Sequence, residues 1–353
     1  MKPDQDGKSR VVIRLDVSGP TGIGHLRRCA VLAQRLKAAG LGVHLLVKAT
    51  NFTPSTELRA VIDVFDSIDP DLPGPTDAAR TAEYCHSVGA SRAVIDHFHA
   101  DEAYQQVLLD AGLRWLQFDG AATWPLWADW VVSMSPAADA AHYLALRRRE
   151  RSKMLIGPRY AILRDEFLRW RGLRKPVPEA RHLLLGFGGG DDRGACLLCL
   201  EALKLAGIEF TADVAVGGLN PRQHDIGAWI NKHGAGEIKL HVDTSHMAEL
   251  MARCDLAIIA GGMTSFEAAA LGTPAIIVQI ADNQRRNAEA WQAMGVAVNL
   301  GNFEDLNAKI VASRIAAVAR DSALRLSLAK AGLEAVDCRG AGRIVAAFDE
   351  MPG

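Results

Sequence analysis

Three features are scarce or missing in this sequence of 353 residues: cysteine, an excess of one charge, and long apolar runs. The six cysteines are too few and too scattered for a disulfide framework, so we expect a reducing, cytoplasmic location. Because 40 Lys and Arg residues balance 41 Asp and Glu residues, bulk electrostatic attraction to nucleic acid or an anionic membrane is excluded. No apolar run approaches the ~18 residues of a membrane span, and the polar start is not typical of a signal peptide. The sequence predicts a soluble globular protein with no membrane span and no nucleic-acid partner.

Short apolar segments alternate with helical patterns along the chain, which is typical of parallel sheets covered on both faces. The length favours two domains or one large α/β domain. Two similar halves each open with a strand, a glycine-rich loop and a helix. The predicted strands are residues 11–15, 43–47, 93–95, 115–118 and 130–132 in the first half, and residues 182–185, 213–216, 238–241, 256–259 and 275–278 in the second.

The domain boundaries are predicted from the interruptions in this alternation. Residues 1–168 form an N-terminal domain and residues 182–335 a C-terminal domain. Residues 169–181 are expected to be a linker, because no strand or helix period survives the prolines there. The end of the chain is predicted to be helical with a break at Gly340 and Gly342, and residues 336–353 are predicted to cross back to the N-terminal domain.

Glycine is over-represented, with 32 residues clustered where predicted strands meet helices. The first loop carries Gly22 and Gly24 and leads into His25. Its spacing lacks the third glycine of a dinucleotide fingerprint, which argues against NAD. At a helix N-terminus the helix dipole would favour the neutral imidazole of His25, so that this residue could act as a base. The alternative is that His25 only caps the helix or packs.

A second loop, residues 261–267, joins a predicted strand to a short helix. Its backbone N–H groups and the Thr264 hydroxyl could hold a diphosphate at the helix N-terminus, and Glu267 could accept hydrogen bonds from a ribose diol. The alternative is a plain capping box made by Thr264 and Glu267. The residues that we assign to ligand binding in this loop are Gly261, Gly262, Thr264, Ser265 and Glu267.

Two further segments follow predicted strands. Asn283 and Gln284 carry amides that suit neutral sugar hydroxyls, whereas in the alternative Asp282 merely caps the next helix. The glycines around Gly189 open the second half, either for backbone contact with a ligand or as a tight turn. No metal is required, because helix N-termini and backbone amides can offset part of a diphosphate charge.

Seven motifs fall in order along nearly the whole chain, and together they resemble one enzyme family: the UDP-2,4-diacetamido-2,4,6-trideoxy-β-L-altropyranose hydrolases of pseudaminic acid biosynthesis. These are relatives of the MurG-type glycosyltransferases with the GT-B fold, an α/β architecture of two Rossmann-like domains that face each other across a cleft. The motifs span residues 13–16, 22–28, 95–97, 157–167, 188–191, 260–267 and 281–284.

The resemblance implies inverting hydrolysis of a UDP-sugar to UDP and the free 2,4-diacetamido sugar, without a cofactor. His25 takes the role of activating water, and residues 261–267 bind the diphosphate and ribose. Asn283 and Gln284 contact the sugar, while Tyr160 and Arg164 line the cleft near the domain junction. With Asp96 of the Asp-His motif, the implied small-molecule site also includes Gly22, Gly24 and Gly189.

The sequence departs from the family at Phe98, at Gly120 and at residues 133–136, which bears on the identity of the sugar. Two rival functions share these residues. A GT-B glycosyltransferase would move the sugar from a UDP donor to an organic acceptor with the same base, and a non-catalytic protein would bind the UDP-sugar without turnover. The oligomeric state is not predicted.

Overall fold

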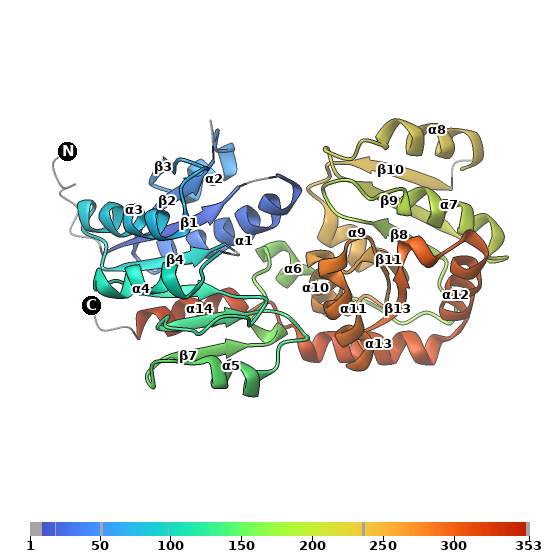
Figure 1. The fold of residues 1–353 in the computed structure, drawn as a ribbon. Coiled ribbons are helices and arrows are strands. Elements are labelled where there is room, and N and C mark those ends of the chain that lie inside the picture. Colours follow the sequence, from blue (N-terminus) through green and yellow to red (C-terminus); the bar gives the residue numbers. More distant parts are fainter. Residues whose placement is uncertain (1–8, 18, 50–51, 98, 235–236, 351–353) are drawn as a thin grey trace. The chain divides into compact units, whose positions relative to one another are not determined.

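The computed structural model describes residues 9–17, 19–49, 52–97, 99–234 and 237–350, except for the side chains of residues 19–23. The chain divides into two compact units (Figure 1). Unit 1 contains residues 1–163 and 339–353, and unit 2 contains residues 164–338. Within the described residues, no helix combines the length and apolar character that a membrane span needs.

Unit 1 is built on a seven-stranded parallel sheet with the order β3-β2-β1-β4-β5-β6-β7. Its interior strand β1 is buried on both faces, as expected where helices cover both sides of a parallel sheet. The strands are β1 (Arg10–Asp16), β2 (Gly42–Lys48), β3 (Val64–Ile68), β4 (Arg92–Asp96), β5 (Arg114–Phe118), β6 (Trp130–Ser133) and β7 (Lys153–Ile156).

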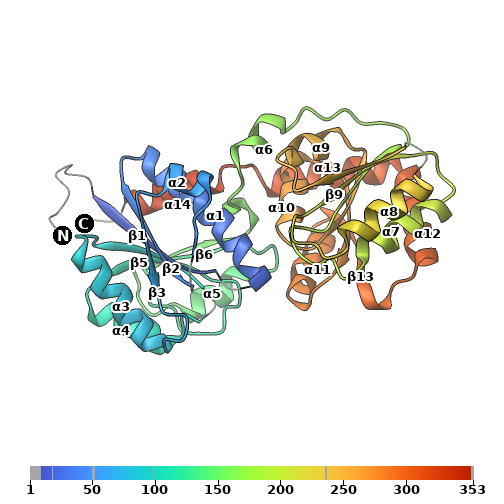
Figure 2. The same cartoon turned by 90° about the horizontal axis from the view of Figure 1, so that it is seen from above.

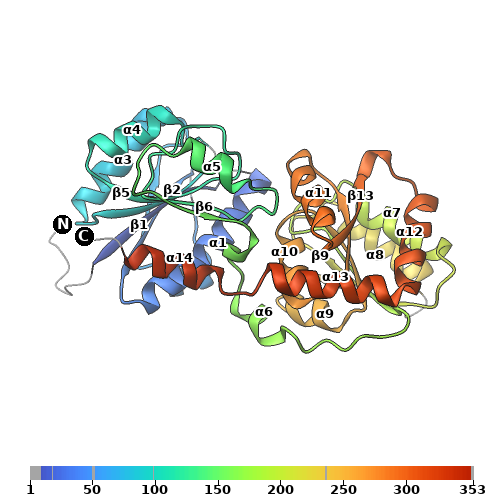
Figure 3. The same cartoon turned by 90° about the horizontal axis from the view of Figure 1, so that it is seen from below.

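Helices cover both faces of this sheet. Figures 2 and 3 show α1 (Gly19–Ala38) and α14 (Gly340–Asp349) on one face, and α3 (Gly74–Ser87) and α4 (Glu102–Asp110) on the other. The core beneath α3 and α4 includes Ala78, Tyr104 and Trp115. The remaining helices of the unit are α2 (Thr56–Val61), α5 (Ala140–Leu146) and the 3₁₀ turn η1 (Pro158–Tyr160).

Unit 2 repeats the plan with six parallel strands in the order β10-β9-β8-β11-β12-β13. The strands are β8 (His182–Gly186), β9 (Thr211–Val216), β10 (Ile238–Val242), β11 (Leu256–Ala260), β12 (Ala275–Gln279) and β13 (Ala297–Asn302). The core on one face is formed with α7 (Ala195–Leu205), α8 (Gln223–His233) and α12 (Ala308–Arg320). The other elements are α6 (Asp165–Trp170), α9 (Met247–Arg253), α10 (Met263–Leu271), α11 (Arg285–Ala293), α13 (Ser322–Ala335), and the 3₁₀ turns η2 (Asp282–Gln284) and η3 (Phe303–Asp305).

All ten predicted strands are present, whereas β3, β7 and β13 were not predicted. Each of these three strands lies at an edge of its sheet. Edge strands pair on one side only and keep polar, partly exposed residues, as Asp66 and Ser67 do in β3. Polar residues interrupt the apolar pattern in β3 and β13, whereas nothing of this kind explains the miss of β7, and the fourth edge strand, β10, was predicted.

Two segments differ from the expectation. Residues 169–181 lie within unit 2, where Arg171 donates to the carbonyl of Val336 at 2.7 Å and Arg174 donates to that of Asp255 at 2.8 Å. The helical end of the chain is interrupted between Ala335 and Gly340 instead of at Gly340 and Gly342, which both lie inside α14. Gly340 is needed for close packing, because a Cβ atom there would lie 2.2 Å from the carbonyl oxygen of Ala161.

This packing predicts opposite effects for two neighbouring glycines of α14. Gly340→Ala forces α14 away from residues 160–161 and should lower the free energy of unfolding by about 2 kcal/mol. Gly342→Ala meets no atom within 4 Å and should raise it by about 0.5 kcal/mol, because alanine favours the helix. Urea unfolding followed by circular dichroism measures both, and equal effects of the two substitutions would contradict the packing argument.

Candidate functional site

Each sheet has one point at which the strand order reverses, and in open α/β sheets ligands bind outside the carboxyl ends of the strands at such points. In unit 1 the reversal lies between β1 and β4, where Leu15 pairs with Asp96. In unit 2 it lies between β8 and β11. Most of the predicted ligand-binding residues follow one of these four strands or lie on the helix after it.

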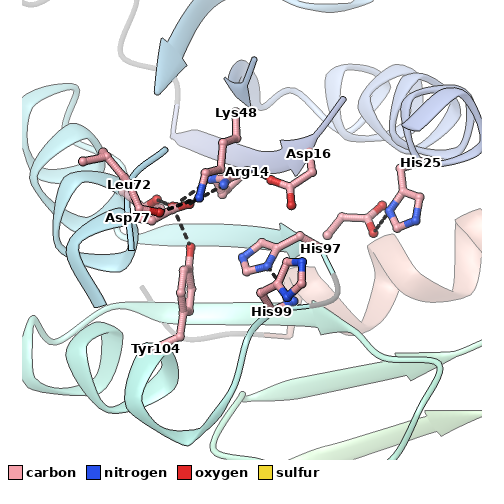
Figure 4. A network of polar contacts seen from close by, with 11 residues as sticks. Arg14, Asp16, His25, Lys48, Leu72, Asp77, His97, His99 and Tyr104 are labelled. Atoms are coloured by element: carbon pink, nitrogen blue, oxygen red, sulfur yellow. Dashed lines mark hydrogen bonds and ion pairs between the residues drawn. The ribbon is translucent and has the colours of Figure 1, made fainter. Parts of the chain in front are cut away.

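In unit 1, His25 of α1 contacts Asp96, the last residue of β4. The Nδ1 atom of His25 lies 2.8 Å from Oδ1 of Asp96 (Figure 4). The Asp96 side chain is completely buried, whereas the His25 side chain is 10% exposed. The buried Asp96 carboxylate thus fixes the orientation of the imidazole ring through its Nδ1 side.

Two more residues of α1 converge on Asp96. Arg28 donates from Nε to Oδ2 at 2.7 Å and also bonds Oδ1, and the Cys29 thiol donates to Oδ2 at 3.1 Å. Residues 25, 28 and 29 lie at positions i, i+3 and i+4 and therefore share one face of the helix. This spacing was readable in the sequence, but only the fold shows that its target is Asp96.

The charge on Asp96 is fixed by these donors. Burial alone would raise the pKa of Asp96, but the charge of Arg28 and the hydrogen bonds from Arg28 and His25 outweigh it, so the pKa lies well below the usual value. Nδ1 of His25 lies 2.8 Å from Oδ1 of Asp96, which only accepts, and 3.0 Å from NH2 of Arg28, which only donates. Because NH2 of Arg28 also donates to Oδ1 of Asp96, the shorter contact with the carboxylate favours the proton of a neutral His25 on Nδ1 and the lone pair on Nε2. The arrangement makes Nε2 the basic atom of the pair.

The position of His25 in its helix corrects the sequence prediction. The helix α1 begins at Gly19, so Gly22 and Gly24 are helical residues and His25 lies in the second turn instead of at the N-terminus. The dipole effect is confined to the first turn, so it does not set the state of His25. Asp96, expected among the ligand contacts, has both carboxylate oxygens engaged by residues of α1.

In unit 2, the segment after β11 forms the N-terminus of α10. Gly262 is the N-cap residue in an extended conformation, no side chain caps the helix, and the first turn has no acidic residue. The capping box of Thr264 and Glu267 is therefore wrong: Thr264 is the second helical residue. A helix start with uncapped N–H groups suits an anion such as a diphosphate.

Two of the predicted contact residues in this region are engaged within the protein. The side-chain carbonyl of Gln284 accepts from the N–H groups of Gly261 and Ile280, both at 3.1 Å, and so ties together the segments that follow β11 and β12. The buried Ser265 hydroxyl donates to the carbonyl of Gly262 at 2.6 Å and accepts from Nε1 of Trp291 at 2.9 Å. Both residues shape the loop. Since the side-chain oxygen of Gln284 is engaged, only its amide nitrogen is left to donate to a ligand.

The other predicted residues of unit 2 lie around α10 and at the end of β8. Arg164 forms an ion pair with Glu166 at 2.8 Å and lies 3.9 Å from Glu267. Asn283 is exposed in η2, where Asp282 caps no helix. Gly189 packs against the next loop so closely that a Cβ atom on Gly217 would lie 2.3 Å from its backbone.

Tyr160 belongs to η1 of unit 1, whereas Arg164 is the first residue of unit 2, so the two predicted cleft residues lie in different units.

Of the residues at which the sequence departs from the hydrolases, Phe98 lies outside the described residues. Gly120 is exposed, and Ser133 is buried at the end of β6. Among the described residues, no group of three or more His, Cys, Asp or Glu side chains could hold a metal ion.

Sequence reasoning missed a buried polar network between β1, β2 and α3. Arg14 of β1 is completely buried and donates to Asp77 of α3 from Nε at 2.9 Å and to Asp16 from NH1 at 2.8 Å (Figure 4). Lys48 of β2 lies 3.3 Å from Asp77. Burial alone would raise the pKa of Asp77, but the hydrogen bond and charge of Arg14 lower it overall. The signal in the sequence was an arginine inside an otherwise apolar strand.

The buried carboxylate of Asp96 predicts a pH-dependent loss of stability in Asp96→Asn. Removing the charge leaves Arg28 without its buried partner and should lower the free energy of unfolding by about 3 kcal/mol at pH 7. Because the folded-state pKa is depressed, the ionic contribution is complete above about pH 4 and is lost as the pH falls through the folded-state value. In urea unfolding, the difference between variant and unmodified protein should shrink from pH 7 to pH 3; a difference that is constant with pH contradicts the assignment.

The loop after β11 gives a prediction with a matched control. A Cβ atom on Gly261 would lie 3.1 Å from Cβ of Gln284, whereas on Gly262 the nearest atom is Nε2 of Gln284 at 3.9 Å. Gly261→Ala should therefore displace Gln284 and lower the free energy of unfolding by about 1 kcal/mol, and Gly262→Ala should leave it within about 0.5 kcal/mol. Chemical denaturation distinguishes them, and a larger loss for Gly262→Ala would be the contrary result.

The chain is similar to curated proteins over part of its length and to solved structures over nearly all of it. No family model matches it. The spore coat polysaccharide biosynthesis protein SpsG of Bacillus subtilis (strain 168) is 28% identical over 206 residues, which are 57% of this chain and 59% of SpsG. The chain spans 59% and 57% of the lengths of two curated relatives that it matches.

Solved structures resemble the chain over nearly its whole length. MurG of Acinetobacter baumannii superimposes with a TM-score of 0.68 at 15% identity and covers 98% of this chain and 100% of its own. The UDP-GlcNAc 2-epimerase of Neisseria meningitidis, bound to UDP-GlcNAc, gives a TM-score of 0.64 at 12% identity, with 97% and 100% covered. At these identities the likeness concerns the fold. The predicted fold class is confirmed: the chain has the two-domain α/β GT-B fold with two parallel sheets.

Proposed function

We propose that this protein hydrolyses a UDP-linked 2,4-diacetamido-2,4,6-trideoxy sugar, with inversion, to UDP and the free sugar, as in pseudaminic acid biosynthesis. The observation that carries the proposal is the His25–Asp96 pair at the strand reversal of unit 1. An imidazole held by a buried carboxylate is a general base of the kind that removes a proton from water. The ordered motifs that resemble the hydrolase family support the choice of substrate.

The names of similar proteins support a nucleotide sugar as ligand. SpsG is named for polysaccharide biosynthesis, and the similar epimerase structure contains UDP-GlcNAc. In our proposal, the N–H groups at the start of α10 bind the diphosphate, Thr264 assists them, and Glu267 accepts hydrogen bonds from the ribose. The uncapped helix start after Gly262 suits this task because it adds N–H donors without formal charge.

The proposed reaction is a single displacement at the anomeric carbon. Nε2 of His25 takes a proton from water as the water oxygen bonds to C1 of the sugar. The C1–O bond to UDP breaks, and UDP leaves with the bonding electron pair. The backbone donors of α10 stabilise the charge on the leaving diphosphate. Asp96 keeps the proton of His25 on Nδ1 and stabilises the imidazolium that forms.

The test is incubation with UDP-2,4-diacetamido-2,4,6-trideoxy-β-L-altropyranose in the absence of an acceptor, with UDP and free sugar followed by chromatography. We expect both products to appear in equal amounts. His25→Ala should slow their release at least a hundredfold, since a positioned base contributes about 10²–10⁴ in rate. His224→Ala is the control, because that side chain is 95% exposed and lies in unit 2.

The other outcomes decide between the rival functions. Absence of UDP release overturns the hydrolase proposal, and binding of the UDP-sugar without turnover then favours a binding protein. Release that needs an added organic hydroxyl compound favours a glycosyltransferase, in which the same base acts on the acceptor. Release that persists in His25→Ala overturns the role of His25.

A further inference from the structure

His97 directly follows Asp96 and is the most unusual buried group near the His25 site. Its side chain is only 6% exposed, and its ring meets the ring of Tyr104 edge to face with centroids 4.7 Å apart. Figure 4 shows it between Asp16 and Tyr104, and its contact with Tyr104 of α4 puts the ring on the face of the sheet opposite to α1 and His25. Asp96 and His97, consecutive residues at the carboxyl end of β4, therefore face α1 and α4, respectively.

The protonation state of His97 follows from one hydrogen bond. The backbone N–H of His99 donates to Nδ1 of His97 at 3.1 Å. Since a backbone N–H can only donate, Nδ1 carries the lone pair and the single proton of the neutral ring is on Nε2. Burial and the nearby charge of Arg14 lower the pKa of His97 to about 4, so the ring is neutral at pH 7.

The Nε2–H group of His97 has no hydrogen-bond partner among the described residues, although it is buried. Buried donors in folded proteins are nearly always paired, so an orphaned donor next to a candidate site points to a missing ligand or water. Its neighbour Asp16 offers the complementary group. One Asp16 oxygen accepts from Arg14 at 2.8 Å, and the side chain is 23% exposed.

We propose that the Nε2–H of His97 donates a hydrogen bond to an oxygen of the bound sugar, and that the Asp16 carboxylate accepts one from the same polar group. The group that fits is a hydroxyl or a secondary amide, because each accepts one hydrogen bond and donates another. This inference rests on the proposed function and assigns it a sugar-binding pair distinct from the His25 base. Arg14 positions Asp16 for this contact and is in turn held by Asp77.

Two substitutions separate this role from a purely structural one. His97→Asn keeps an acceptor for the N–H of His99 but removes the donor at Nε2. His97→Gln places an amide donor near the Nε2 position but loses the acceptor at Nδ1. If His97 binds the sugar, Asn should raise KM for the UDP-sugar about tenfold with little change in kcat, and Gln should raise it by no more than about threefold.

The affinity for UDP alone, measured by calorimetry, should remain unchanged in both variants. If His97 only secures the local backbone, the order is reversed: Asn behaves as the unmodified protein and Gln shows the defect. That result overturns the inference and leaves the proposed function intact. Absence of UDP release by the unmodified protein overturns the proposed function, and the sugar contact of His97 with it.

A measurement on the unmodified protein covers the case in which a variant does not fold. In protein labelled with ¹⁵N-histidine, the Nε2–H signal of His97 should shift when the free 2,4-diacetamido sugar is added and should not shift with UDP. A signal that stays in place at a sugar concentration that moves other resonances overturns the inference.

Discussion

The arrangement of the site in unit 1 depends on one buried carboxylate. Asp96 ends the strand beside β1 at the point where the strand order reverses, and it receives His25, Arg28 and Cys29 from a single face of α1. A buried anion is costly unless it is paired, so Arg28 makes the carboxylate tolerable and the carboxylate in turn orients His25. The same contacts that fix α1 on the sheet thus define which imidazole nitrogen is basic.

Unit 2 has the same architecture as unit 1 but a different proposed task. Under the proposed function it binds an anionic group in a chain of almost no net charge, and the donors are the backbone N–H groups at the uncapped start of α10. Gln284 and Ser265 hold that loop by hydrogen bonds to its backbone, so they determine its shape. Glycine at position 261 leaves room for Gln284, because a Cβ atom there would lie 3.1 Å from Cβ of that residue.

The sequence was sufficient for the buried strands, the two-domain α/β fold and the position of α10 after β11, because each is marked by apolar runs or by glycines at strand ends. The edge strands β3 and β13 were missed because polar residues interrupt their apolar pattern, and β7, with only four residues, was missed as well. The start of α1 was misjudged because Gly22 and Gly24 are typical of a loop, yet both are helical. The contacts of Asp96 and the orphaned donor of His97 depend on which strands are neighbours, and one sequence alone does not contain that information.

The central claim is that His25 delivers water to the sugar carbon and not to phosphorus. The most direct test is turnover of the UDP-linked 2,4-diacetamido sugar in H₂¹⁸O, with both products analysed by mass spectrometry. Attack at C1 places the ¹⁸O atom on the free sugar and leaves UDP unlabelled. Label in the phosphate of UDP would mean that a P–O bond is cleaved, and this would contradict the account.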